Sequence, residues 1–294
     1  MKLLVTGISG QVGWELQRTL LPLGEVIPCD RAALDLTQPD QIPAVLQEIR
    51  PDVVLNPAAY TAVDRAESEP ALAETVNAIA PGVLAEACRA VGALLVHYST
   101  DYVFDGTGDR PYREDDAPNP LNVYGRTKLA GEQAIQAVGG DYLILRTSWV
   151  YGLRGQNFCR KMLALARERS HLRIVADQIG APTWSRAIAE LTAQIVAQNP
   201  RDRSGVYHLT AAGHTSWYGF AKAILALDPE ANHHKVTVVE PIPSSAYPTP
   251  AQRPANSRLD NTKLYIHFGL ALPAWEVGLA LALDNHHNRK ALVE

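Results

Sequence analysis

The clearest indication of the fold lies in residues 2–13, which read Lys2-Leu3-Leu4-Val5-Thr6-Gly7-Ile8-Ser9-Gly10-Gln11-Val12-Gly13. The apolar run that ends at Thr6 predicts a strand, and the pattern that continues through Leu16 and Leu20 predicts a helix. Between them the three glycines have the roles of a dinucleotide-binding turn: a tight bend at Gly7, close approach of backbone to pyrophosphate at Gly10, and helix–strand packing at Gly13. A glycine triplet alone is weak evidence, but its place between a strand and a helix favours a coenzyme site that includes Gln11 and Val12.

Strand and helix patterns alternate five times in the first half of the chain. After the first strand, further strands are predicted at 25–29, 52–55, 94–98 and 142–146. Such alternation is typical of an α/β protein with a doubly wound parallel sheet (Rossmann) and right-handed crossovers. We expect a dinucleotide-binding domain at 1–152, joined by part of 172–198, and a second, smaller α/β substrate domain in most of 153–294.

Three groups of residues after the predicted strands extend the expected coenzyme site. Asp30 follows the second strand about 20 positions after the glycines, where an acidic side chain accepts from the adenosine ribose hydroxyls of NAD. The neighbouring Arg31 could instead pair with the 2′-phosphate of NADP, so both coenzymes stay open, and a capping role would explain Asp30 as well. The other groups are Asp35-Leu36, expected beside adenine unless they form an ordinary capped loop, and the small-residue turn with Ala58, Ala59 and Tyr60.

The candidate catalytic residues lie between Ser99 and Lys128. Thr100 follows the fourth strand, at the sheet edge where open α/β sheets hold ligands. Tyr124 and Lys128 are four residues apart on a predicted helix, so they share a face. An ammonium beside a phenol lowers its pKa and makes it a usable proton donor, and Thr100 could bond the same substrate oxygen. A surface tyrosine and a solvated lysine can have the same spacing by chance, so the neighbouring motifs decide whether this pair is catalytic.

Composition narrows the class of protein. The chain has 294 residues, 27 basic and 31 acidic side chains and a formal net charge of −4, which does not suggest a nucleic-acid surface or a basic membrane patch. No stretch approaches the roughly 18 apolar residues of a membrane span, and the N-terminal run is too short for a signal peptide. Cys29, Cys88 and Cys159 are far apart and indicate neither a disulfide framework nor a zinc site. We expect a cytoplasmic protein without nucleic-acid or membrane partners.

These motifs together resemble the extended short-chain dehydrogenases/reductases, and more narrowly the dTDP-4-dehydrorhamnose reductases. The resemblance spans residues 1 to about 270. It rests on the glycine loop and on four runs: Asn56-Pro57-Ala58-Ala59-Tyr60-Thr61-Ala62-Val63-Asp64, Ser99-Thr100-Asp101-Tyr102-Val103-Phe104-Asp105-Gly106, Tyr124-Gly125-Arg126-Thr127-Lys128 and Arg146-Thr147-Ser148-Trp149-Val150-Tyr151.

The resemblance implies reduction of the 4-keto group of dTDP-6-deoxy-L-lyxo-4-hexulose (dTDP-4-dehydrorhamnose) to dTDP-L-rhamnose by NADPH or NADH. In this reaction Tyr124 would protonate the developing alkoxide, Lys128 would hold the nicotinamide ribose, and Thr100 would bond the carbonyl oxygen. The related dehydratases have a glutamate where Tyr102 stands here, so elimination lacks its base and reduction is favoured.

Substrate contacts are expected from Asp101 and Tyr102, which could bond sugar hydroxyls, and from Trp149, which could pack on the sugar or be a structural tryptophan at a domain junction. Arg253, in a Pro- and Ser-rich segment, is a candidate for the diphosphate because a guanidinium binds phosphate bidentately; Arg258 is a weaker one, and a rim salt bridge would explain either.

The resemblance also implies a homodimer, and some such reductases hold Mg²⁺ at the dimer interface through glutamates. Glu15 and Glu190 match two of these, but Asp284-Asn285 stands where a further glutamate would be expected, so Mg²⁺ is doubtful and no metal ligand is assigned. Two alternatives stay open: a reductase of another nucleotide-linked 4-ketosugar, and a non-catalytic binding subunit resembling the β subunit of methionine adenosyltransferase.

Overall fold

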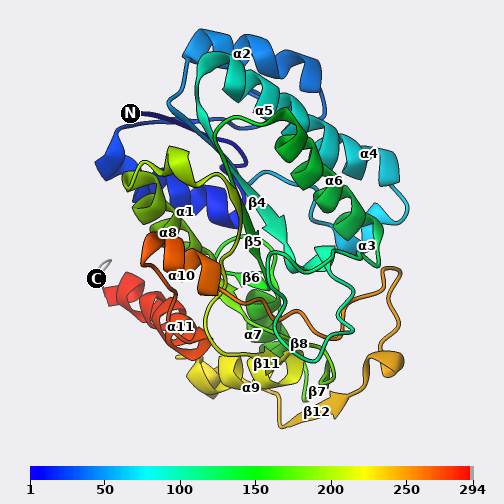
Figure 1. Ribbon diagram of the computed structural model, residues 1–294. Coiled ribbons are helices and arrows are strands. Elements are labelled where there is room, and N and C mark those ends of the chain that lie inside the picture. Colours follow the sequence, from blue (N-terminus) through cyan, green and yellow to red (C-terminus); the bar gives the residue numbers. More distant parts are fainter. Residues whose placement is uncertain (292–294) are drawn as a thin grey trace.

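The computed structural model describes residues 1–291 and is built around a parallel sheet of six strands (Figure 1). The strands lie in the order β10 (Gly205–His208), β5 (Tyr142–Thr147), β4 (Leu94–Thr100), β3 (Val53–Asn56), β1 (Lys2–Val5) and β2 (Glu25–Pro28). All neighbouring strands run parallel. From β1 the chain moves outward to β2 and then returns to the other side of β1 as β3. Ligands of doubly wound sheets bind where the strand order reverses in this way.

Helices cover both faces of this sheet (Figure 1). One face carries α1 (Gln11–Thr19), α8 (Ser185–Ala197) and α10 (Thr262–Phe268), and the other carries α2 (Ile42–Ile49), α5 (Ala80–Val91) and α6 (Val123–Val138). Successive strand residues point to opposite faces, so Leu3 and Val5 enter the first core and Leu4 enters the second. This architecture confirms the predicted doubly wound α/β fold.

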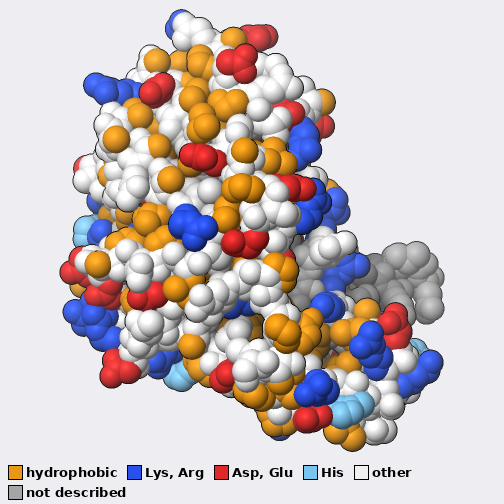
Figure 2. Space-filling model, turned by 90° about the vertical axis from the view of Figure 1, so that its right-hand side faces the viewer, with side chains coloured by type: hydrophobic (Ala, Val, Ile, Leu, Met, Phe, Trp, Pro, Cys, Tyr) orange, Lys and Arg blue, Asp and Glu red, His pale blue; other side chains and the backbone are white. Residues whose placement is uncertain are grey.

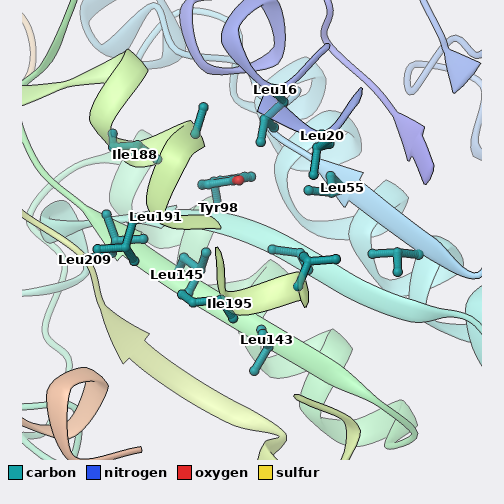
Figure 3. Packing of buried hydrophobic residues seen from close by; sticks show 14 of the residues in the cluster. Leu16, Leu20, Leu55, Tyr98, Leu143, Leu145, Ile188, Leu191, Ile195 and Leu209 are labelled. Carbon is teal, nitrogen blue, oxygen red and sulfur yellow. The ribbon is translucent and has the colours of Figure 1, made fainter. Parts of the chain in front are cut away.

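The core under α1 and α8 joins distant parts of the sequence (Figure 3). Leu16 of α1 and Ile188 and Ile195 of α8 are fully buried against sheet residues such as Leu55 and Leu145. Burial of each such side chain contributes about 1.5–3 kcal/mol. Because α8 and β10 follow residue 152, the later half of the chain completes the large sheet and covers one of its faces.

The remaining elements form a smaller lobe beneath the sheet in Figure 1. It contains α7 (Phe158–Glu168), α9 (Trp217–Leu227) and α11 (Trp275–Ala291), with short strand pairs β7 (His171–Val175) and β12 (Val238–Ile242), β8 (Ile179–Gly180) and β11 (Thr215–Ser216), and β6 (Val150–Tyr151) and β9 (Thr183–Trp184). Phe220, Leu279 and Trp275 are buried in its separate core.

Short helical segments complete the described chain. Before α5 lie α3 (Val63–Ala66), α4 (Pro70–Glu74) and a π-helical turn (Thr75–Ile79); single 3₁₀ turns occupy Leu21–Leu23, Pro39–Gln41, Asp101–Val103, Pro200–Arg203, Ala231–His233 and Ser244–Ala246. The π-helical turn positions Asn77, which holds the backbone of Tyr60 through both its amide atoms and also donates to Oγ1 of Thr127 on α6. It therefore ties the loop after β3 to α6.

Side chains of both charge signs are interspersed over the face shown in Figure 2. This distribution fits the small net charge and shows no single-sign field on that face. Among the described helices, none combines the length and apolar character needed to cross a membrane.

Candidate active site

The glycine turn has the geometry expected of a phosphate-binding loop. Gly7 has φ +55°, and a Cβ there would lie 2.9 Å from Cα of Ala58. A Cβ on Gly13 would collide with the carbonyl of Gly7, so this glycine is needed for α1 to pack on β1. Gly10 caps α1 without a side-chain hydrogen bond, which leaves backbone N–H groups and the positive end of the helix dipole available to an anion.

A cavity of about 530 Å³ lies at the carboxyl ends of β1, β3 and β4, beside this turn. It is lined by nearly all of the residues predicted to hold the coenzyme: Gly7, Gly10, Gln11, Val12, Gly13, Asp30, Arg31, Asp35, Leu36, Ala58, Ala59, Tyr124 and Lys128. Tyr60 is not among its lining residues, because its hydroxyl turns to Oε2 of Glu69, 2.5 Å away. The glycine turn, the free helix end and the lining residues that follow β1 and β3 and end β4 fit a dinucleotide.

Asp30 and Arg31 both line this cavity. One carboxylate oxygen of Asp30 also accepts from the backbone N–H groups of Ala32 and Ala33 at 2.9 and 3.0 Å, so the residue both caps a turn and faces the cavity. Asp35 accepts from Thr37 N–H, which lowers the carboxyl pKa, with a smaller contribution from the charge of Arg31.

Tyr124 and Thr100 meet beside the cavity. Thr100 ends β4, and its hydroxyl donates to Oδ1 of Asp101 at 3.1 Å and accepts from Tyr102 N–H at 3.2 Å. Burial raises the pKa of Tyr124 to about 12, against a lowering by the Thr100 hydrogen bond. The expectation that Lys128 would lower this pKa is therefore wrong in this structure, because burial desolvates the phenolate and Lys128 is not among the groups that shift its pKa.

Lys128 is 1% exposed and projects from α6 toward β4. Its Nζ donates to the carbonyl of Tyr98 at 2.7 Å and lies 3.0 Å from Nε2 of His97. Burial lowers the pKa of Lys128 to about 8, and the charge of Glu132 acts in the opposite direction. No sequence pattern links His97 with this lysine, because the contact forms only when strand β4 and helix α6 pack together.

Asp101 and Tyr102 lie beside the same pair. Asp101 is 3% exposed, and burial raises the pKa of its carboxyl to about 6. The rings of Tyr102 and Tyr124 meet edge to face with centroids 5.7 Å apart. Burial also raises the pKa of the Tyr102 phenol, so Tyr102 is a neutral hydroxyl group.

The other two predicted substrate residues are already engaged by protein partners. The Trp149 ring stacks on Trp217 with centroids 3.5 Å apart, and its backbone has φ +47°, an uncommon conformation for a large side chain. Arg253 pairs with both carboxylate oxygens of Asp64, at 2.8 and 3.1 Å, and thereby joins the loop after β12 to α3.

Arg258 is half-buried and does not line the cavity; its guanidinium bonds Oδ1 of Asn256 and the carbonyl of Asp109. Glu15 and Glu190 both face Arg186, whose guanidinium lies 3.8 and 2.7 Å from their oxygens. Within residues that the structure describes, no group of three or more potential ligand side chains could hold a metal ion.

Several residues beside the site were not predicted. Ser99, Thr147, Gly155 and Gln156 also line the cavity, and the last two come from the loop that follows β6. Gln11 fixes this loop, because its amide oxygen accepts from Asn157 at 2.8 Å. Such contacts carry no local sequence signal, since the partners are far apart in the chain.

A family model described as "RmlD substrate binding domain" matches residues 1–288. The dTDP-4-dehydrorhamnose reductase of Burkholderia thailandensis is 53% identical over 292 residues, covering 96% of this chain and 98% of that protein. The Escherichia coli K12 reductase is 47% identical, with 97% of each chain covered.

Solved structures agree with these sequence relatives. The Bacillus anthracis dTDP-4-dehydrorhamnose reductase in complex with NADP has a TM-score of 0.90, 39% identity, and coverage of 97% of this chain and 99% of its own. The UDP-glucose 4-epimerase of Thermotoga maritima shares the fold, with a TM-score of 0.80 at 20% identity over 99% of this chain and 100% of its own. The chain thus belongs to the dTDP-4-dehydrorhamnose reductase family of extended short-chain dehydrogenases/reductases.

Proposed function

We propose that this chain reduces the 4-keto group of dTDP-4-dehydrorhamnose to give dTDP-L-rhamnose, with NADPH or NADH as the reductant. Its family makes it an NAD(P)-dependent oxidoreductase acting on CH–OH groups, and the NADP complex of the Bacillus anthracis relative supports the coenzyme. The observation that carries the proposal is the position of Tyr124 and Lys128 in the lining of a cavity that fits a dinucleotide, with Thr100 next to the phenol.

Tyr124 is the proposed acid. The bound coenzyme supplies a hydride to the carbonyl carbon. Tyr124 donates the proton of Oη to the carbonyl oxygen as negative charge develops there, and its raised pKa keeps that proton in place near neutral pH. Thr100 is placed to hydrogen-bond the same oxygen, because its hydroxyl already lies within reach of the phenol.

Lys128 is the proposed partner of the coenzyme ribose. Two of the three N–H bonds of its ammonium are directed to Tyr98 O and His97 Nε2, which leaves the third for a ribose hydroxyl. The glycine turn with Gln11 and Val12 holds the pyrophosphate, and Asp30, Arg31, Asp35 and Leu36 hold the adenosine half.

On the substrate side we propose that Asp101 and Tyr102 bond sugar hydroxyls and that Trp149 closes the sugar pocket. Arg253 reaches the diphosphate with its position fixed by Asp64. We further propose that residues 1–152 supply most of the coenzyme site and 153–294 most of the substrate site. A homodimer acting in the cytoplasm is the proposed state, from the family resemblance.

The test is oxidation of NADPH and of NADH by the purified protein with enzymatically prepared dTDP-4-dehydrorhamnose. Tyr124→Phe removes the acid but keeps the ring, and should lower kcat by about 10²–10⁴-fold. Tyr265→Phe is the matched control, because Tyr265 is 60% exposed on α10; it should keep the activity of the unmodified chain. Coenzyme binding without turnover would contradict the proposed substrate and favour another nucleotide-linked ketosugar or a binding role.

A further inference from the structure

A line of buried polar side chains runs across the sheet to Lys128. Thr6 follows β1, Asn56 ends β3, His97 lies within β4, and all three are at most 1% exposed. Oγ1 of Thr6 lies 2.7 Å from Oδ1 of Asn56, Nδ2 of Asn56 lies 3.1 Å from Nδ1 of His97, and Nε2 of His97 lies 3.0 Å from Nζ of Lys128. These side chains join the strand that leads to the glycine turn with the lysine beside the coenzyme cavity.

The chemistry of these groups allows two arrangements. Burial lowers the pKa of His97 far below its usual range, so the ring is neutral and carries its proton on one nitrogen only. If Nδ2 of Asn56 donates to Nδ1, the proton is on Nε2, and Nζ must accept it as a neutral amine. If the amide turns so that Oδ1 faces Nδ1, the proton is on Nδ1, and Nε2 accepts from a charged ammonium.

We propose that Asn56 and His97 form a relay that sets the charge of Lys128, with the amide orientation and the histidine tautomer reversing together as the lysine gains or loses its proton. His97 is a positioning residue: it acts on the coenzyme only through Lys128. The two arrangements differ by one proton on Nζ, which exchanges with solvent, while the imidazole keeps a single proton throughout. The relay rests on the proposed function only in that Lys128 is the residue that faces the coenzyme.

Among the residues that the structure describes, the charged and titratable groups near Lys128, apart from His97, do not hydrogen-bond its Nζ. On α6, Glu132 lies one turn beyond Lys128, but its carboxylate is hydrogen-bonded at 2.6 and 2.9 Å by Arg146 of β5. Tyr124 on α6 and Asp101 after β4 are the other titratable groups nearby, and neither donates to or accepts from Nζ. Within the described chain the direct partners of Nζ are the Tyr98 carbonyl, which accepts in either arrangement, and His97, which must change with the lysine.

The tautomer of His97 tests the proposal without substrate or coenzyme. In protein labelled with ¹⁵N-histidine, long-range ¹H–¹⁵N spectra distinguish a ring nitrogen that carries a proton from one that does not, and His97→Gln identifies the signals. We expect the Nδ1–H form near neutral pH and the Nε2–H form at alkaline pH, with a midpoint near the lysine pKa of about 8. In Lys128→Met the pH-dependent change should disappear. A single tautomer throughout, or a change that persists in Lys128→Met, would overturn the relay.

Asn56→Asp supplies an isosteric variant with the opposite expectation. A carboxylate only accepts, so it holds the proton on Nδ1 and keeps Nε2 as the acceptor of a charged lysine. The NADPH dissociation constant, measured by coenzyme fluorescence, should then stay low to a pH about one unit higher than in the unmodified chain. If the pH at which NADPH binding weakens were unchanged or lower in Asn56→Asp, the relay would be contradicted. Because neither readout uses the ketosugar, a failure of the proposed substrate would show itself separately, in the turnover assay alone.

Discussion

At the candidate site, burial changes the ionisation of neighbouring groups in different directions. It raises the pKa of Tyr124 to about 12 and of Asp101 to about 6, and it lowers the pKa of Lys128 to about 8. In each case the neutral form gains, because the charged form loses solvation. The sequence showed that Tyr124 and Lys128 share a helical face, but desolvation of the phenol depends on the chain folded around it.

Asp101 gives a stability prediction with a definite sign. Its pKa in the folded protein, about 6, lies above the usual 3.8, so the folded state binds more protons between these values. Stability from this group is therefore full below about pH 4 and is lost as pH rises through 6. Asp101→Asn, which resembles the protonated carboxyl, should raise the free energy of unfolding near pH 8 by about 1–3 kcal/mol.

Urea unfolding of both proteins at several pH values is the measurement. The difference between Asp101→Asn and the unmodified chain should shrink toward acid pH, where Asp101 is protonated. The exposed Asp109→Asn is a matched control for loss of a carboxylate and should leave the unfolding free energy within about 0.5 kcal/mol. A constant difference across the pH range would show that burial of the Asp101 charge is not the cause.

At the scale of elements, two glycines of the strand–turn–helix at 2–19 have different roles: Gly13 allows packing within the fold, and Gly10 allows the coenzyme to approach. A Cβ on Gly13 would meet the Gly7 carbonyl within the fold, whereas a Cβ on Gly10 would lie 3.2 Å from that oxygen. Gly13→Ala should therefore destabilise the protein by about 3 kcal/mol or more. Gly10→Ala should fold with little loss but bind NADPH at least about tenfold more weakly, because the methyl group stands where the pyrophosphate approaches.

Thermal unfolding and coenzyme titration, performed on both variants, separate these effects. Equal losses of stability in the two variants would contradict the division of roles. Equal NADPH affinity for Gly10→Ala and the unmodified chain would show that the glycine turn does not bind the pyrophosphate.

Elements built from local patterns were predictable, and partners brought together by folding were not. The glycine turn, the six-stranded sheet's first five strands and the helix with Tyr124 and Lys128 follow from short-range spacing. The stack of Trp149 on Trp217 and the pairing of Arg253 with Asp64 join residues far apart in the chain, the latter 189 positions apart. A sequence shows that an indole or a guanidinium is present near a site, but not which protein group will occupy it.

At the scale of the whole molecule, the chain passes back and forth between the large sheet and the smaller lobe, so neither is built from one continuous segment. After residue 152 the chain enters the smaller lobe, returns to add α8 and β10 to the sheet, and later adds α10. The sequence analysis expected part of 172–198 to join the first domain, and α8 lies within that range. The pairing of β10 with β5 could not be predicted, since a short strand pattern does not specify its neighbour.

Because α8, β10 and α10 come from later in the chain, we expect that residues 1–152 will not fold alone. Without α8 the sheet loses Ile188, Leu191 and Ile195, all nearly or fully buried, and at about 1.5–3 kcal/mol each their loss approaches the 5–15 kcal/mol that stabilises a typical domain. The fragment would also expose Leu16, Leu20 and the sheet residues beneath them. We expect it to show no cooperative thermal transition and to bind an apolar dye, whereas the full chain should melt in one calorimetric step. A sigmoidal transition in the fragment, with NADPH raising its midpoint, would instead mean that the coenzyme half holds its own core and that α8 and β10 are additions to it.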